Sequence, residues 1–150
     1  MLNSNKDRIF LNIAIEISKF SHCISHQVGC IIVRDGRILS TGYNGTPAGY
    51  LNCDEYFDKN NFEREKHHSW SSIHEIHAEL NAILYSTKTG GKSLNESVAY
   101  VTLQPCHDCV KNLIQAGIVE IIYGQSYDKM VNWGEIVRFA QENDVTIRKI

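Results

Sequence analysis

Hydrophobic residues recur at helical spacing at the start of the chain. Ser4 and Asn5 are both good N-cap residues, so a helix is predicted to begin at one of them. The apolar residues that then repeat at intervals of three or four are Ile9, Ile13, Ile17 and Phe20. The spacing predicts that these four side chains form one apolar face of the helix.

The pattern changes to that of short strands after residue 27. VGCIIV (28–33) is a short apolar run with β-branched residues, and ILSTGY (38–43) is the next strand-like segment. Between them lies Asp35-Gly36, a dipeptide typical of a two-residue β-hairpin turn. The two strands are therefore predicted to pair antiparallel.

Helices and strands alternate in the second half of the chain. A helix is predicted at about 77–88 and stops at Gly90-Gly91. Strands are then predicted at 98–103, 118–124 and 145–150, and helices at 106–117 and 133–143. Short helical crossovers imply parallel neighbouring strands and right-handed connections. The predicted fold class is α/β, with a mixed sheet of about five strands and helices on both faces.

In residues 44–72 the hydrophobic residues show neither the spacing of a helix nor the alternation of a strand. A structureless stretch of more than about 20 residues is unusual in a compact domain, so something is expected to organise it. We therefore predict a loop insertion at about 44–76 within a single domain that spans residues 1–150.

Composition and charge narrow the function classes. The chain has 15 Lys and Arg against 17 Asp and Glu, for a formal net charge of −2. Proteins that bind a nucleic-acid backbone usually carry a basic excess, so this balance argues against that class. The N-terminus lacks the layout of a signal peptide and no long apolar run follows, which predicts a cytoplasmic protein. The five cysteines are then expected to be free thiols or metal ligands.

A metal site is predicted where two helices begin. Pro105 suits the first position of a helix, which places Cys106 and Cys109 in or beside its first turn. His77 and Glu79 start another helix, and first-turn side chains can both reach an ion beyond the helix end. His77, Cys106 and Cys109 are the predicted ligands of a zinc ion that keeps its fourth position open.

Glu79 is the predicted catalytic residue, because two thiolates leave zinc a weak Lewis acid that needs a base beside it. It would take a proton from the activated water and deliver it to a leaving nitrogen. A lone C-x-x-C is more often a structural zinc site, and His77 alone would more often be an ordinary polar residue. The combination of H-x-E with P-C-x-x-C is more specific, since it is the signature of zinc-dependent deaminases.

Several longer segments extend this interpretation: STGYNGTPAG, HAELNAI, VTLQPCHDC, IQAGI and VTIRKI. From about residue 8 to the C-terminus the chain resembles the deoxycytidylate (dCMP) deaminases of the cytidine deaminase-like superfamily, in the form carried by T-even bacteriophages. The resemblance implies a three-layer fold, hydrolysis of dCMP to dUMP and ammonia for dTMP synthesis, and a homo-hexamer.

The same resemblance implies a set of substrate contacts. Asn44 would bind the deoxyribose, and the backbone of Ala78 and the Gln104-Pro105 turn would hold the pyrimidine edge. The positions implied for the 5′-phosphate and the ring are Ser25, Gln27 and Tyr127. Gln27 brings no charge to a phosphate, so His26 or Lys129 is considered as the missing cation. Without the resemblance, each of these residues is equally well explained as an ordinary polar residue on the protein surface.

A second zinc is implied by the resemblance, with ligands Cys23, Cys53, His67 and Glu75; His68 could replace His67. Metal binding there would explain how the insertion stays ordered. The alternative is two unrelated thiols and surface polar residues. Cys30 lies in the apolar strand and is interpreted as a buried structural thiol.

The family is activated by dCTP with Mg²⁺ and inhibited by dTTP, which implies an allosteric site here. The matching positions are Gly42, Tyr43, Asn44, Gly45, Tyr85 and Lys88. Tyr85 and Lys88 depart from the phage pattern, and Lys offers a phosphate a point charge in place of the fork of Arg. The alternative is that both simply cover a helix surface.

Three other functions remain open at this stage. A tRNA or single-stranded DNA base deaminase shares the zinc motif, but the balanced charge and the lack of an evident basic, aromatic-rich groove disfavour it. A free-cytidine deaminase is disfavoured by the GYNG stretch and the long loop. A non-catalytic, zinc-stabilised subunit that senses nucleotides would have no need for Glu79.

Overall fold

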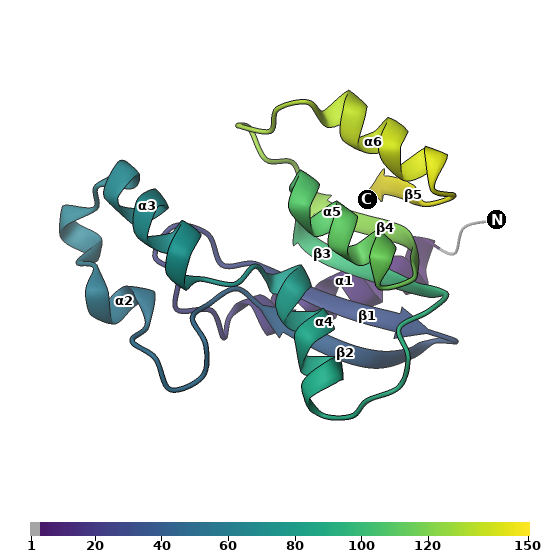
Figure 1. The fold of residues 1–150 in the computed structure, drawn as a ribbon, viewed down its shortest axis with the longest axis horizontal. Coiled ribbons are helices and arrows are strands. Elements are labelled where there is room, and N and C mark those ends of the chain that lie inside the picture. Colours follow the sequence, from purple (N-terminus) through teal and green to yellow (C-terminus); the bar gives the residue numbers. More distant parts are fainter. Residues whose placement is uncertain (1–3) are drawn as a thin grey trace.

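The computed structural model describes residues 4–150. Its strands are β1 (Gly29–Arg34), β2 (Arg37–Tyr43), β3 (Ser97–Leu103), β4 (Ile118–Gln125) and β5 (Thr146–Lys149). Within the described residues they form one five-stranded sheet in the order β2-β1-β3-β4-β5 (Figure 1). β1 pairs antiparallel with both β2 and β3, whereas β4 pairs parallel with β3 and β5. The predicted mixed sheet is confirmed.

The helices divide between the two faces of this sheet. Their bounds are α1 (Ser4–Ser18), α2 (Cys53–Tyr56), the short 3-10 helix η1 (Lys59–Asn61), α3 (Arg64–His74), α4 (Ala78–Lys88), α5 (His107–Gln115) and α6 (Trp133–Glu142). α1 packs on one face, and α4, α5 and α6 cover the other (Figure 1). The predicted three-layer α/β architecture is therefore confirmed.

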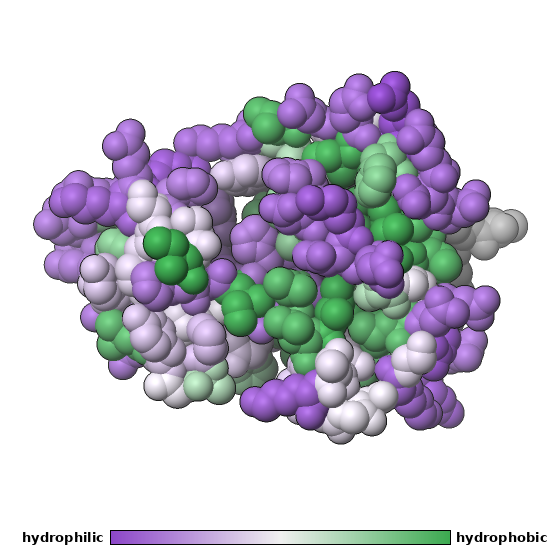
Figure 2. Space-filling view, viewed as in Figure 1, coloured by the Kyte–Doolittle hydropathy of each residue, from purple (hydrophilic) through white to green (hydrophobic). Residues whose placement is uncertain are grey.

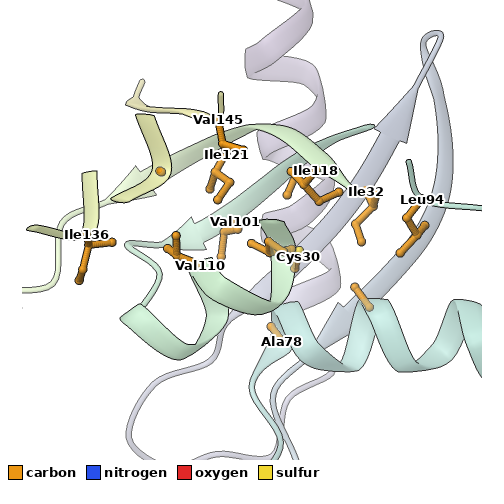
Figure 3. Close-up of a cluster of buried hydrophobic side chains, with 14 residues drawn as sticks. Cys30, Ile32, Ala78, Leu94, Val101, Val110, Ile118, Ile121, Ile136 and Val145 are labelled. Carbon is orange, nitrogen blue, oxygen red and sulfur yellow. The ribbon is translucent and has the colours of Figure 1, made fainter. Parts of the chain in front are cut away.

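Alternate residues of β1 serve the two layers. Ile31 and Val33 point to the α1 side, where they pack with Phe10, Tyr100 and Ile122. Cys30 and Ile32 point to the other side and join Ala78, Val101, Val110 and Ile121 beneath α4 and α5 (Figure 3). Cys30 is fully buried, as its position in an apolar strand predicts. This second core fixes the starts of α4 and α5, which carry the candidate metal ligands.

The predicted apolar face of the first helix is confirmed for Ile13 and Ile17, which pack against the core, and is wrong for Ile9 and Phe20. Ile9 and Phe20 are 52% and 64% exposed. The buried positions are Asp7, Phe10, Leu11, Ala14 and Ser18. The buried face therefore includes a charged residue that the hydrophobic pattern leaves out: the carboxylate of Asp7 accepts hydrogen bonds from Tyr100 and Arg148.

The hairpin turn agrees with the sequence-based prediction, and the start of α5 differs from it by a small shift. Asp35 and Gly36 have φ values of 52° and 71°, which a tight two-residue hairpin turn requires. Pro105 is not the first residue of its helix, because Cys106 is the N-cap and α5 begins at His107. Cys109 still lies in the first turn.

The insertion is not structureless. α2, η1 and α3 project from one end of the sheet (Figure 1). α3 was missed because its buried residues are His67 and Trp70, not aliphatic residues at helical spacing. Trp70 packs with Cys23 and Cys53 in a small core of its own, with Ile24 and Phe57 at its edge. None of the helices in residues 4–150 combines the length and apolar character that a bilayer crossing requires.

Candidate active site

Two helix N-termini meet at His77, Cys106 and Cys109. His77 is the N-cap of α4 and Cys106 is the N-cap of α5, so both side chains project beyond their helix ends. Nδ1 of His77 lies 3.3 Å from Sγ of Cys109 and 3.6 Å from Sγ of Cys106. The three candidate ligands are thus brought together from segments about thirty residues apart, as the motif spacing predicts.

These distances fit a tetrahedral zinc site. Zinc binds sulfur at about 2.3 Å and imidazole nitrogen at about 2.0–2.1 Å, which puts tetrahedral N and S donors about 3.6 Å apart. No fourth His, Cys, Asp or Glu side chain of residues 4–150 joins the group. His77 is exposed, whereas Cys106 is half-buried and Cys109 is buried, so the open side of the group is at His77.

Hydrogen bonds couple the protonation of these three side chains. The hydrogen bond with Cys109 lowers the pKa of the Cys106 thiol to about 4. The same bond, together with burial, raises the pKa of Cys109 far above its ordinary value. The bond to Cys106 raises the pKa of His77 to about 9. A thiolate beside two protonated donors is a set in which a divalent cation can replace the two protons.

Glu79 lies in the first turn of α4 and is 4% exposed. Burial is the main reason that its pKa is raised, and the charge of His77 opposes this effect. A carboxyl group that accepts a proton more readily than usual suits a residue that must take and return one near neutral pH. Glu79 therefore has both the position and the proton affinity of a general base beside the metal ligands.

A cavity of about 490 Å³ opens onto these residues. Its walls come from the segment 23–28, α3, the start of α4, residues 103–107 and the β4–α6 connection. Figure 2 shows the hollow between the insertion, at left, and the body of the molecule. Its size is suited to a small organic ligand.

A second group of metal-binding side chains lies beside the same cavity. Cys23, Cys53, His67 and Glu75 place one donor atom each within 4.8 Å of one another. Nε2 of His67 is 3.5 Å from Sγ of Cys23 and 3.8 Å from a carboxylate oxygen of Glu75. His68, the considered substitute, points to the cavity and is not in this group.

Burying these four polar side chains costs free energy unless a ligand such as a metal ion binds them. One Glu75 oxygen accepts a hydrogen bond from Ser71 at 2.6 Å, while the other, Oε1, is buried with no partner among residues 4–150. Burial raises the pKa of both thiols, to about 12 for Cys53. It lowers the pKa of His67. A buried carboxylate with one unpartnered oxygen, close to an imidazole and two thiols, fits a metal ion.

Comparison with known proteins identifies the family to which this site belongs. Residues 4–125 match the family model described as "Cytidine and deoxycytidylate deaminase zinc-binding region". The chain belongs to this family. Deoxycytidylate deaminase of Enterobacteria phage T2 is 40% identical, over 87% of this chain and 86% of its own. That of phage T4 is 38% identical, over 87% of this chain and 83% of its own.

A solved member of the family has the same fold. The crystal structure of dCMP deaminase from the cyanophage S-TIM5, in complex with dCMP and dUMP, is 28% identical and covers all of both chains with a TM-score of 0.77. The family resemblance and the cytidine deaminase-like fold expected from the sequence are both confirmed.

The cavity brings together most of the residues that the family resemblance implies for the substrate. Ser25, Asn44, Ala78, Gln104 and Tyr127 all line it. Gln104 also accepts a hydrogen bond from the backbone N–H of Tyr127 at 2.9 Å, which joins two of its walls.

Three of these implied residues have other roles in the structure. Asn44 accepts a hydrogen bond from the N–H of Val28 and donates one to the carbonyl of His26, both at 2.8 Å, so its amide is already largely engaged. Gln27 does not line the cavity; it donates to the Ser21 carbonyl at 2.6 Å. Pro105 is buried and likewise lies behind the wall.

Sequence reasoning missed Arg64 and the orientation of His68. Both line the cavity from α3. The signal that could have revealed them is the spacing of four between them, which puts both on one face of a helix. With no helix predicted in this region, that spacing carried no meaning. His26 and Lys129, the two considered phosphate ligands, also line the cavity.

The implied allosteric residues follow the contact between β2 and α4. Tyr43 accepts a hydrogen bond at its carbonyl from Asn81, and Gly45 pairs with Ile76 just before α4. Gly42 is buried against α4, whereas Tyr85 is 56% exposed. Lys88 is exposed at the last residue of α4.

Proposed function

We propose that this chain hydrolyses dCMP to dUMP and ammonia. The observation that carries the proposal is the burial of Glu79 beside the His77, Cys106 and Cys109 group, at one end of a cavity large enough for a nucleotide. The relatives named deoxycytidylate deaminase support the choice of substrate, as does the cyanophage enzyme, whose crystal structure is a complex with dCMP and dUMP.

The metal site is assigned to zinc held by His77, Cys106 and Cys109, because a tetrahedral set of one imidazole and two thiolates suits this ion. When bound, zinc supplies a water acidified toward neutral pH. The N-terminal dipoles of α4 and α5 favour the thiolate form of the ligands.

Glu79 moves the protons of the reaction. It takes a proton from the attacking water as the new C4–O bond forms, and it gives that proton to N3 of cytosine. It then takes the remaining proton from the new C4 hydroxyl and delivers it to the amino group, so that the C4–N bond breaks as the C4 carbonyl forms and ammonia leaves. The raised pKa of its carboxyl, caused by burial, makes the carboxylate a stronger base and lets it hold the proton until it is passed on.

The rest of the cavity binds the nucleotide. The backbone of Ala78 and the turn at Gln104-Pro105 hold the pyrimidine edge, and Asn44 binds the deoxyribose with the part of its amide that remains free. Ser25 and Tyr127 lie on the wall where ring and phosphate are expected. Gln27 acts only indirectly in this proposal, because its side chain holds the Ser21 carbonyl.

A second zinc is proposed at Cys23, Cys53, His67 and Glu75. The support is the convergence of four donors and the unpartnered oxygen of Glu75. It would fasten the insertion, about residues 44–76, to the rest of a single domain of 150 residues. Metal ligation supplies folding free energy on the order of 10 kcal/mol where no site exists in the unfolded chain.

Regulation by dCTP with Mg²⁺ and by dTTP is proposed at the contact between β2 and α4, in a homo-hexamer. The supporting observation is that Tyr43 of β2 and Tyr85 of α4 are both well exposed, and that Asn81 of α4 donates a hydrogen bond to the Tyr43 carbonyl. The cytoplasm is the proposed location, because the ligand thiols stay free only under reducing conditions.

An ammonia-release assay tests the function. The zinc-loaded protein is given dCMP, cytidine, dCTP or a cytosine-bearing oligonucleotide, each alone and with dCTP–Mg²⁺ or dTTP added. We expect rapid turnover of dCMP, slow turnover of cytidine and none of the oligonucleotide. Preference for the oligonucleotide or for free cytidine would replace the proposal with a different deaminase, and no turnover of any substrate would favour a sensing subunit.

A further inference from the structure

A row of polar side chains along α3 faces the cavity. Arg64, His68 and Ser71 line it and follow one another by four and three residues, which places them on one face of the helix. The neighbouring face carries the buried residues His67 and Trp70. The insertion therefore does more than cover the cavity: it presents charged and polar groups to whatever the cavity binds.

The negatively and positively charged residues of the cavity wall differ in their exposure to solvent. Its two carboxylates, Glu75 and Glu79, belong to the two metal-binding regions, and Glu79 is buried. Its two permanent cations, Arg64 and Lys129, are on exposed residues. The cavity thus has an acid–base end near Glu79 and a basic rim.

Arg64 forms no ion pair within the described part of the chain. Within residues 4–150 no carboxylate oxygen lies within 4.0 Å of its guanidinium. By contrast, Lys66, two residues later, pairs with Glu63 at 2.9 Å. An arginine that faces a cavity without a counterion is available for an anionic ligand.

The backbone that carries Arg64 is well fixed. One turn further along α3, the ring of His67 lies 5.4 Å from the rings of both Phe57 and Phe62. His67 is also 3.5 Å from Cys23, whose segment forms another wall of the cavity. Only the side chain of Arg64 has to become ordered when an anion binds, which lowers the entropic cost of binding.

We propose that Arg64 binds the 5′-phosphate of the substrate and makes the enzyme prefer a nucleotide to its nucleoside. This inference rests on the proposed function. The guanidinium offers two parallel N–H donors to phosphate oxygens, a match that an ammonium group lacks. Lys129, His26 and His68 add donors around the same rim. Arg64 supplies the charge that Gln27 cannot.

Kinetics on a substrate pair test the role of Arg64. The zinc-loaded wild type, Arg64→Gln, Arg64→Lys and Lys66→Gln are each assayed with dCMP and with deoxycytidine. For Arg64→Gln we expect kcat/KM for dCMP to fall roughly 10- to 100-fold, mainly through KM, as the loss of a charged hydrogen bond predicts. The value for deoxycytidine should change by less than about twofold, because that substrate has no phosphate to lose.

Two of the variants separate phosphate binding from general effects. Arg64→Lys should recover part of the preference for dCMP, since it keeps the charge and loses the fork. Lys66→Gln removes one positive charge from the same turn of α3, away from the cavity, and should keep the wild-type preference.

Each result decides between distinct conclusions. An unchanged preference in Arg64→Gln, or an equal loss on both substrates, would overturn the role given to Arg64. A loss of preference in Lys66→Gln as large as in Arg64→Gln would show that net charge alone matters, which also overturns it. If the wild type deaminates neither substrate, the proposed function itself fails, and that outcome is seen before any variant is compared.

Discussion

Gly42 of β2 lies so close beneath α4 that a Cβ there would be 2.4 Å from the backbone nitrogen of Ala82 and 2.3 Å from the carbonyl oxygen of Ala78. Both contacts are with backbone, which cannot rotate away. The helix that carries Glu79 can therefore pack this close to the sheet only because residue 42 has no side chain. This gives Gly42 a structural role in addition to its proposed place in the allosteric segment.

Gly42→Ala is expected to destabilise the protein by about 1–3 kcal/mol, the usual cost of overpacking a core. It should also lower turnover, because α4 and with it Glu79 must shift. Urea unfolding and the kcat for dCMP measure the two effects. Gly45→Ala is the control, since a Cβ at Gly45 meets nothing within 4 Å. Equal stability of the two variants would contradict this account of the packing.

Glu79→Gln should remove catalysis and leave the site otherwise intact. The amide has nearly the same shape as the carboxyl, so the buried position remains filled, but it cannot accept and return a proton. We expect turnover to fall by at least ~10²–10⁴-fold, the contribution of positioned proton transfer. Zinc content, measured by atomic absorption, should match the wild type. Near-normal turnover in this variant would remove Glu79 from the mechanism.

The sequence was sufficient for the parts of the site that follow from local spacing. His77, Cys106 and Cys109 were predicted as one group because each lies at a recognisable helix start, and the structure brings them within 4.8 Å of one another. The alternation of strands and helices after residue 77 was predicted for the same reason: each element there has aliphatic residues at a single clear period.

What the pattern could not supply depends on contacts between distant segments. α3 was missed because its buried face is built from His67 and Trp70, which a hydrophobic period does not detect. The buried face of α1 was predicted only in part, because Asp7 on that face is bonded to Arg148, 141 residues later. Arg64 became visible as a cavity residue only once α3 was placed opposite the β4–α6 connection.

Zinc affinity at the catalytic site should rise steeply with pH. In the metal-free site the pKa of His77 is raised to about 9 and that of Cys109 is raised further, so both are protonated at pH 7. Cys106, with a pKa lowered to about 4, is already a thiolate. Zinc must therefore displace two protons, and its apparent affinity should increase up to roughly 100-fold per pH unit below 9.

Above pH 9 the slope should fall to roughly tenfold per unit, because only the proton of Cys109 is then displaced. Competition with a chelator of known pH dependence measures this affinity. Cys53→Ser protein, in which the second group is disrupted, isolates the catalytic site in this titration. A pH-independent affinity between 7 and 9 would show that the metal-free donors do not hold these protons.

Loss of one ligand of the proposed second zinc should loosen the packing of the insertion (about residues 44–76) against the rest of the domain. Cys53→Ser is expected to lower the zinc content from two ions per chain to one and to make the segment around α3 susceptible to protease, because the group ties α2, α3 and the segment near Cys23 together. Cys30→Ala is the matched control, since it removes another buried thiol that belongs to neither group. One zinc per chain in fully loaded wild type would end the proposal of a second site.

The charged network that joins α1 to the last strand should contribute strongly to stability. Asp7 is buried, with 7% of the residue exposed. Its carboxylate accepts hydrogen bonds from Tyr100 at 2.8 Å and Arg148 at 2.6 Å. Asp7→Asn keeps the shape but removes the charge that faces Arg148, at an expected cost of about 1–3 kcal/mol in unfolding free energy. Glu16→Gln on the same helix breaks an exposed pair with Lys19 and should cost about 0.5 kcal/mol or less. Urea titrations of both variants at pH 7 measure the difference, and a cost for Asp7→Asn no greater than that of Glu16→Gln would mean that the network only fills space between α1 and β5.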